Sequence, residues 1–237
     1  MLCFGLHPAF CQDTAKKKAS HTHEITLSVG YSGGTGYEIN DFASFSAVYR
    51  HTHDLWHLSL GIQNVYTSTD LTAAIGIASQ FPWKWIIQPN IAIEGIYHFG
   101  FLSTKAIMQD ILFTAEGSLL LAPTKTKIKF LFGSAFNKTD ITALSSYSLI
   151  ITDYYTVSSE SICQTIKNID LEAGVRSFSF FCYNFFPMPQ VFLNVDWHIT
   201  PSVSISNNFS ILYTNIWGQH NVQIDHLYYT CGVTYAF

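Results

Sequence analysis

The sequence predicts an all-β fold: a closed antiparallel transmembrane β-barrel of about twelve strands, within a range of eight to fourteen. Three observations carry this prediction. Apolar and polar residues alternate with period two along nearly the whole chain, as they do in a β-strand. The 237 residues are 48% hydrophobic but only 12% charged, about half the charged share of a typical soluble domain. The polar residues of the alternation are mostly Ser, Thr, Gly, Asn and Gln.

The predicted strands follow one another closely from residue 23 onward. In the first, Ile25, Leu27 and Val29 share one face, while Thr26 and Ser28 share the other. Each segment is near the 9–11 residues that a tilted strand needs to cross a bilayer. In chain order the apolar rows span 25–31, 43–49, 56–62, 71–77, 91–99, 111–121, 128–132, a weaker row at 141–155, 169–177, 191–199, 203–213 and 222–237.

The connections between these strands alternate in length. If the first strand runs outward, the short turns at 51–54, 122–126 and 200–202 lie on the periplasmic side. The connections 33–41, 101–106, 180–189 and 214–221 then lie outside, and most of them are longer. The outer connection predicted at 137–140 is an exception, because it is short. Short inner turns and longer outer loops are typical of membrane barrels.

Other classes of protein fit the composition less well. No stretch of about 18 apolar residues is present, so no helix is predicted to span a membrane. A formal net charge of −4 argues against a nucleic-acid partner. A water-soluble sandwich is the alternative β architecture, but its polar face would carry Lys, Glu and Arg. In a barrel, that face lines the lumen and needs few charges.

The first twenty residues form a separate segment, predicted to be a leader remnant and a periplasmic tail, before a single barrel of residues 21–237. Residues 1–11 are apolar and lack the basic start of a complete signal peptide, which suggests that the true translation start lies upstream. Cleavage after Cys11, a lipid-modified Cys11 and an ordinary disordered N-terminus remain open.

The C-terminal segment alternates and ends on an aromatic residue, with apolar positions at Leu227, Tyr229, Cys231, Val233, Tyr235 and Phe237. It resembles the closing strand of bacterial outer-membrane β-barrel proteins, whose small members include OmpX-like and OmpW-like proteins and oligosaccharide channels. The resemblance implies an outer-membrane location, contact with outer-membrane lipid, and recognition of Tyr235 and Phe237 by the barrel-assembly machinery.

Aromatic residues are predicted to form two interfacial girdles, because their rings favour the headgroup level. The periplasmic girdle comprises Tyr49, Trp56, Trp197, Tyr235 and Phe237, and the outer girdle comprises Tyr31, Tyr97, Phe99 and Tyr213.

Function is expected to depend on the inward face. The candidate lumen-lining residues are Glu24, Arg50, His57, Glu94, His98, Glu116, Lys129, Asp170, Glu172, Arg176, Asp196, His198 and His226. Six acids against three bases among them leave an excess of three negative charges. The sequence therefore predicts a passive, mildly cation-preferring channel for small polar or ionic solutes. The alternative is a closed structural or surface-interaction barrel that contacts partners through its outer loops.

Counting from the predicted turns places Arg176 opposite Asp196, and Glu94, Glu116 and Lys129 on three consecutive strands. Opposite charges at cross-strand distance are expected to pair. The same counting puts Cys163 in a periplasmic connection and Cys182 at the outer end of the next strand. A disulfide between them is therefore not expected.

No enzyme and no cofactor are predicted. His57 shares a face with Ser59, and His198 lies two residues from Asp196, but no third partner completes a catalytic triad.

A metal site is a further possibility, since His21 and His23 at the start of the first strand should neighbour His51 and His53. Four imidazoles suit zinc or copper. The alternative is a solvated polar rim.

Overall fold

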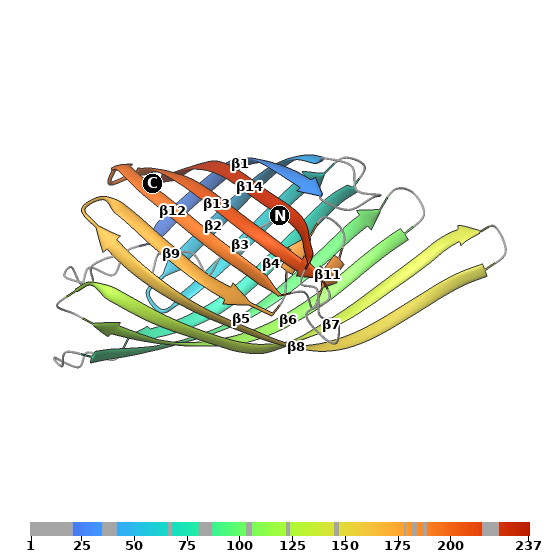
Figure 1. The fold of residues 1–237 in the computed structure, drawn as a ribbon, viewed down its shortest axis with the longest axis horizontal. Helices are drawn as coiled ribbons and strands as arrows, with labels where there is room; N and C mark the ends of the chain where they lie inside the picture. The colour runs from blue at the N-terminus through green and yellow to red at the C-terminus, as the bar shows by residue number, and fades with distance from the viewer. Residues whose placement is uncertain are drawn as a thin grey trace.

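We analysed a computed structural model, which describes residues 21–34, 42–65, 68–80, 87–102, 106–121, 124–144, 147–177, 179–181, 184–186, 189–214 and 223–237. Fourteen strands are described, and twelve of them form one closed barrel (Figure 1). The barrel strands are β1 (Thr22–Gly34), β2 (Phe42–His53), β3 (Trp56–Val65), β4 (Ser68–Gln80), β5 (Ile87–Leu102), β6 (Ala106–Leu121), β7 (Thr126–Leu144), β8 (Tyr147–Ile166), β9 (Ile169–Arg176), β12 (Gln190–Thr200), β13 (Val203–Thr214) and β14 (Gln223–Ala236).

Each barrel strand pairs antiparallel with the barrel strands that precede and follow it, so β9 pairs with β12. The last strand, β14, pairs with β1 to close the barrel. The short strands β10 (Ser179–Phe181) and β11 (Asn184–Phe186) form a separate hairpin between β9 and β12. The predicted closed all-β barrel is thus confirmed, and its strand number equals the predicted twelve. Closure joins the first strand to the last, so the described sheet has no open end strand.

The strand registers set the width of the barrel. Following paired residues once around the barrel from Ile166 returns to β8 at Thr152, fourteen residues away. Twelve strands with this stagger tilt by about 40° and place the backbone about 11 Å from the axis. Side chains on one wall can therefore reach far into the lumen.

The two faces of the strands lie as the alternation predicts. Ile25, Leu27 and Val29 on β1 are exposed, as are Leu60 and Ile62 on β3. The inward positions between such rows are buried or half-buried, and most of them are polar. Exposed apolar rows around a closed barrel suit lipid and not water.

Part of the lumen is filled by apolar side chains that the sequence analysis did not place there. Ala74, Leu112, Leu131, Ala135 and Val157 form a buried cluster, with Tyr155 packed against it. These residues come from β4, β6, β7 and β8, so the packed side of the lumen lies against those strands.

The outer connection predicted at 137–140 is wrong, because these residues lie within β7, which continues to Leu144. Their polar side chains have the composition that is typical of a turn. In the structure Asn137 is buried and its Nδ2 donates a hydrogen bond to Asp110 Oδ1 over 2.5 Å, so the polar group is satisfied inside the barrel. Cys163 is also misplaced by the sequence analysis, since it is buried within β8. Cys182 lies outside the described residues, so the prediction of no disulfide stays a prediction.

Tight turns join strands at the rim that the sequence analysis assigns to the periplasm. Asp54, Lys125 and Lys167 adopt left-handed backbone conformations, with φ between 48° and 57°, in the turns after β2, β6 and β8. Such φ values reverse a chain within a few residues. At the opposite rim the β7–β8 hairpin extends well past its neighbours (Figure 1). No helix in the described residues is long and apolar enough to cross a membrane.

Candidate functional site: the barrel lumen

One wall of the lumen is built around the buried carboxylate of Glu172 on β9. Lys129 Nζ on β7 lies 3.1 Å from Glu172 Oε1, and Ser161 Oγ on β8 donates to the same oxygen over 2.7 Å. Asn194 Nδ2 on β12 lies 3.4 Å from Glu172 Oε2. Three strands thus supply partners to one carboxylate on a fourth. We call the inward side chains of β7, β8, β9 and β12 the charged wall.

A second carboxylate on the charged wall lies nearer the periplasmic rim. Asp170 Oδ1 accepts a hydrogen bond from Thr165 Oγ1 over 2.6 Å, and Asp170 Oδ2 lies 2.8 Å from His198 Nε2. Asp196 is paired with Asp170 in the β9–β12 ladder and is buried. Neighbouring partners hold these carboxylates in place, which makes this side of the lumen rigid.

The predicted pairing of Arg176 with Asp196 is wrong. In the register of β9 and β12, Arg176 lies opposite Gln190, six residues away from Asp196. The Arg176 guanidinium instead sits 4.1 Å from the centroid of the Phe192 ring, a cation–π contact. Glu94, Glu116 and Lys129 lie on the three consecutive strands β5, β6 and β7, as predicted. Lys129 also has a partner that the sequence did not indicate, which is Glu172.

The opposite wall carries small side chains. Thr26, Ser28 and Gly30 face inward on β1, next to Ser44 and Ser46 on β2 and to Thr230, Gly232 and Thr234 on β14. We call this set the small wall. Its hydroxyls bond to one another, as Thr26 Oγ1 to Thr234 Oγ1 over 2.8 Å and Ser28 to Ser46. Thr26, Ser28 and Ser44 remain half-buried, whereas most inward residues of the charged wall are buried. Ser46, Thr230 and Gly232 are buried, so the small wall is the more accessible wall only over part of its length.

Glycine is required at one position of the small wall by close packing. A Cβ atom at Gly30 would lie 2.4 Å from Ser44 Oγ and 2.8 Å from Thr230 Cγ2. Both neighbours would have to move to accept any larger residue.

The predicted lumen residues fall into three groups. Those with inward side chains that are buried are His57, Glu116, Lys129, Asp170, Glu172 and Asp196. Those half-buried are Glu24, Arg50, Arg176 and His198. Glu94 and His98 lie in β5 and His226 in β14, but their side chains lie outside the described part of the chain.

Sequence reasoning missed several inward groups. Asp70, Asp110 and Lys127 are buried on the inward face, as is Asn137. Asp70 precedes Leu71 and Asp110 precedes Ile111, so both continue the alternation of the rows that follow them. Their even or odd position along the strand was the available signal. The sequence analysis did not use it, because each residue lies just outside a predicted apolar row.

Contacts are described for both histidines that were considered for catalysis. His198 contacts Asp170, and His57 lies against Gly76, where a Cβ would be 2.4 Å from His57 Cε1.

The two histidine pairs do meet at the periplasmic rim, on the outward face of the barrel. His23 pairs with His51 in the β1–β2 ladder, and their ring centroids are 4.6 Å apart. The His21 centroid lies 4.1 Å from that of His53 and 6.2 Å from that of His51. Two imidazoles on one tetrahedral zinc would have centroids about 5 Å apart, given Zn–N bonds of about 2 Å. His51 Nδ1 is buried without a hydrogen-bond partner.

The ring nitrogens do not converge in this arrangement. Among the described residues no group of three or more His, Cys, Asp or Glu side chains is placed to hold a metal ion. The metal site stays a prediction, which requires the rings to turn about their side-chain bonds.

If these histidines bind metal, calorimetric titration of the folded barrel with Zn²⁺ or Cu²⁺ should give a saturable site. Replacing His51 and His53 together by Asn should abolish it, because two of the four ligands are lost. His57→Asn, which removes a buried inward histidine, is the control and should leave the titration unchanged. A solvated rim predicts no saturable binding in any variant.

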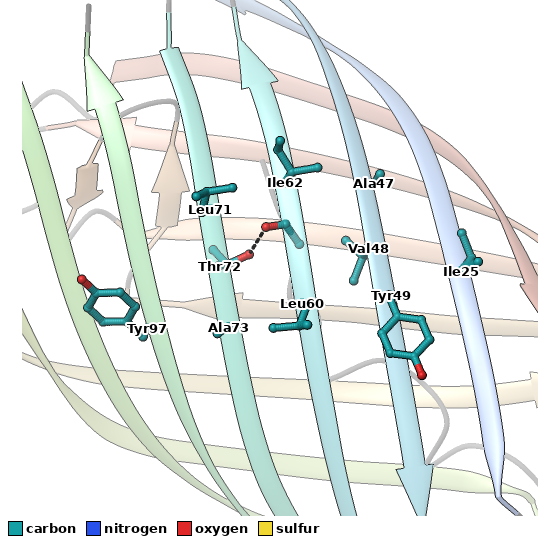
Figure 2. Close-up of a pocket in the computed structure, with 11 residues that line it drawn as sticks. Ile25, Ala47, Val48, Tyr49, Leu60, Ile62, Leu71, Thr72, Ala73 and Tyr97 are labelled. Atoms are coloured by element: carbon teal, nitrogen blue, oxygen red, sulfur yellow. Dashed lines mark hydrogen bonds between the residues drawn. The ribbon is translucent and has the colours of Figure 1, made fainter. Parts of the chain in front are cut away.

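The outward face also contains an apolar hollow of about 660 Å³ (Figure 2). Its lining includes the small side chains of Ala47 and Ala73, with Tyr49 and Tyr97 at its sides. The hollow opens to the lipid-facing side and carries almost no polar surface, so it belongs to the membrane-contacting exterior and not to the lumen.

A closed barrel with an apolar exterior and a polar interior defines the class of this protein. It is an outer-membrane β-barrel, and its location is the bacterial outer membrane. No protein-family model matches the sequence, and no curated protein matches it either.

Comparison with solved structures relates this fold to that of a porin. The NanC porin aligns over 89% of this chain and 98% of its own, with a TM-score of 0.54 and 12% identity. The outer membrane phospholipase A of Escherichia coli aligns over 89% and 92%, with a TM-score of 0.48 and 8% identity. The β domain of the Bordetella autotransporter BrkA aligns over 93% and 100%, with a TM-score of 0.47 and 9% identity. The TM-score of 0.54 relates this fold to that of the NanC porin, and at 12% identity the likeness extends to the fold alone.

Proposed function

We propose that the barrel is a narrow passive channel for small polar or ionic solutes. The observation that carries the proposal is the difference between the two walls. Large ionised side chains on the charged wall are held by neighbours, so they do not collapse across the lumen. The small wall faces them with half-buried hydroxyls and glycine. A polar path of this kind keeps water in contact with the lumen, which lowers the desolvation cost of the inward charges.

The charge of the path favours cations. Among the described inward residues that are buried or half-buried, the acids are Glu24, Asp70, Asp110, Glu116, Asp170, Glu172 and Asp196, and the bases are Arg50, Lys127, Lys129 and Arg176. Seven acids against four bases leave an excess of three negative charges. Rings of carboxylates concentrate cations, and salt screens this effect.

Reconstitution into a planar bilayer tests the proposal. We expect stepwise conductance and a reversal potential that reports cation preference in a salt gradient. Glu24→Gln should lower that preference, since Glu24 is half-buried at the periplasmic mouth opposite Arg50. Glu160→Gln removes an outward-facing carboxylate and is the matched control, with no expected change. Folded protein without conductance contradicts the channel, and anion preference contradicts the charge assigned to its lumen.

A closed surface-interaction barrel is the second candidate, favoured by the β7–β8 hairpin. From residue 149 to 154 every described residue of β8 is exposed on both faces, including Leu149, Ile150 and Tyr154. The hairpin projects past the neighbouring strands at the outer rim (Figure 1). An exposed apolar ribbon of this kind suits contact with another molecule. The finer likeness to OmpX-like and OmpW-like barrels stays a prediction.

Recognition by the barrel-assembly machinery is part of the same proposal. Deleting Phe237 should lower the amount of protein inserted in cells. In the barrel its backbone exchanges two hydrogen bonds with His23, at 2.9 and 3.1 Å, and its ring stacks on His23 and Tyr235. Barrel folding is read from the mobility difference between boiled and unboiled samples in detergent gels. Ala236→Gly, which retains the terminal Phe237, is the control. Normal insertion without Phe237 would count against this role.

A further inference from the structure

The apolar hollow on the outward face adjoins the four rim histidines, which we call the histidine cluster. On β1, Ile25 lines the hollow two residues further from the rim than His23. On β2, Tyr49 lines it two residues further from the rim than His51. Two residues of a strand span about 7 Å. A molecule longer than this can therefore contact the hollow and the histidine cluster at the same time.

The hollow follows a row of paired residues across five strands. Its lining includes successive ladder partners from β1 to β5, which are Ile25, Tyr49, Leu60, Ala73 and Tyr97. The small side chain of Ala73, between Leu60 and Tyr97, leaves space open (Figure 2). Because each step to the next tilted strand raises the row by about 3 Å, the row climbs about 12 Å from Ile25 to Tyr97. The hollow thus runs from the histidine cluster into the apolar band, as a lipid acyl chain does.

The hollow alone does not select one lipid from the membrane. Lipid chains are as apolar as the side chains that line the hollow, so a chain gains little hydrophobic free energy by entering it. Its volume of about 660 Å³ lies within the range of small-molecule sites, about 300–1,000 Å³. Close packing can therefore hold a chain there, but selection requires contacts with a headgroup.

The histidine cluster lies at the level of lipid headgroups. The Trp56 ring packs against His51 and His53, with centroid distances of 5.2 and 5.6 Å. The Phe237 ring stacks on His23 with a centroid distance of 5.5 Å. Aromatic rings on the outward face of a barrel gather at the membrane interface. A phosphate at this level can therefore reach the imidazoles.

The hydrogen-bonding capacity of the cluster is not used up within the protein. The Nδ1 atoms of His51 and His53 are buried without a hydrogen-bond partner. A headgroup can use them after a half-turn of the ring about its Cβ–Cγ bond, which exchanges the two ring edges. His23 Nδ1 lies 2.8 Å from Tyr49 Oη, and when the tyrosine donates this bond the N–H of His23 is on Nε2. Such N–H groups suit the oxygens of a phosphate.

The charges at this rim fit a zwitterionic headgroup. Along β1, β2 and β3 the outward rows contain no Lys or Arg, so a strongly anionic headgroup would find no fixed cation. Asp54 is exposed in the turn after β2, and its Oδ2 lies 3.4 Å from His53 Nδ1. Phosphatidylethanolamine combines a phosphate with an ammonium group. Its phosphate can accept hydrogen bonds from the imidazoles while its ammonium donates to Asp54.

We propose that this face binds one phosphatidylethanolamine molecule, with an acyl chain in the hollow and the phosphate on His23, His51 and His53. The hollow and the headgroup contacts are separate observations that meet at Tyr49, which lines the hollow and contacts His23. A bound lipid would occupy the imidazoles that the predicted metal site needs. The site lies outside the lumen, so this inference does not depend on conduction.

Lipid retention tests the headgroup contacts. The barrel is folded in vesicles of equal parts dioleoyl phosphatidylethanolamine and dioleoyl phosphatidylcholine, and the lipid that stays bound is measured by native mass spectrometry. Phosphatidylethanolamine should be preferred about fivefold, the effect of one hydrogen bond, because choline has no N–H to donate to Asp54. Asp54→Asn should remove that preference. Replacing His51 and His53 together by Phe keeps the ring packing and should lower retention of both lipids.

Two results would overturn the headgroup contacts. One is equal retention of the two lipids by the unsubstituted protein. The other is loss of the bound lipid on adding EDTA, which would mean that a metal ion and not the imidazoles holds the phosphate.

Filling the hollow tests the acyl chain. Ala73→Leu should lower retention of both lipids by about fivefold, because an overpacked hollow no longer accepts the chain. Ala173→Leu on β9 is the matched control, since Ala173 is an exposed outward alanine away from the hollow. Free phosphoethanolamine, a headgroup without chains, should not displace the lipid. Heat modifiability confirms that each variant is folded. Equal retention by the two alanine variants, or displacement by phosphoethanolamine, contradicts a chain bound in the hollow.

Discussion

Replacing Ser28 by Trp should reduce the single-channel conductance by about tenfold or more, because a bulky ring then occupies the accessible side of a narrow lumen. Ser28 projects inward from the small wall, is half-buried, and is paired with Gly232 and Ser46 on the adjacent strands. The backbone lies about 11 Å from the axis, so one indole spans much of the remaining gap toward the charged wall.

Leu27→Trp is the matched control for Ser28→Trp. Leu27 precedes Ser28 on β1 and is 50% exposed on the lipid face, where a Trp is tolerated. Both variants should show the same heat modifiability, and Leu27→Trp should conduct as the unsubstituted protein does. Retention of full conductance by folded Ser28→Trp would place the conducting path elsewhere and would favour the closed barrel.

The second large effect is expected at the ion pair of the charged wall. Lys129→Met should lower the free energy of unfolding by about 3–5 kcal/mol, because it leaves the buried Glu172 carboxylate without its cation. Ser161 and Asn194 would remain as hydrogen-bond partners of Glu172, but neither compensates its charge. Urea unfolding in lipid vesicles measures the change.

Two further variants separate charge from packing. The double variant Lys129→Met with Glu172→Leu should recover part of the loss, since no uncompensated charge remains. Lys138→Met on the same strand removes a half-buried outward lysine near the outer end of β7, and should change stability much less. If Lys129→Met and Lys138→Met lower the free energy of unfolding equally, the Lys129–Glu172 pair contributes no more to stability than a surface charge does.

Much of the fold could be predicted because a membrane barrel repeats one simple rule. Each strand alternates lipid-facing and lumen-facing residues, so Ile25, Leu27 and Val29 reveal the outward face without any knowledge of the neighbouring strands. Short turns such as that after His53 were recognisable for a similar local reason. The segment at 137–140 misled the prediction because polar residues inside a barrel have the same composition as a turn, and only the partner of Asn137 on β6 distinguishes the two.

The candidate site was predictable as a set of inward residues, but not as a set of contacts. Alternation places Lys129 and Glu172 on the inward face, yet nothing local indicates that they meet, because β8 lies between their strands. Ser161 on β8 and Asn194 on β12 complete the group, and their sequence separation from Lys129 leaves no signal in a single chain.

The sequence by itself determined which side chains face lipid and which face the lumen, because the period of a strand is two residues. Only the tertiary structure decided the register between strands. A slip of one residue turns a strand inside out, but a slip of an even number preserves both faces and leaves no trace in the pattern. Arg176 was expected opposite Asp196 and lies opposite Gln190, a difference of six residues. The partners of the lumen charges and the stagger of the barrel both depend on that register, which closure of the twelve strands sets as a whole.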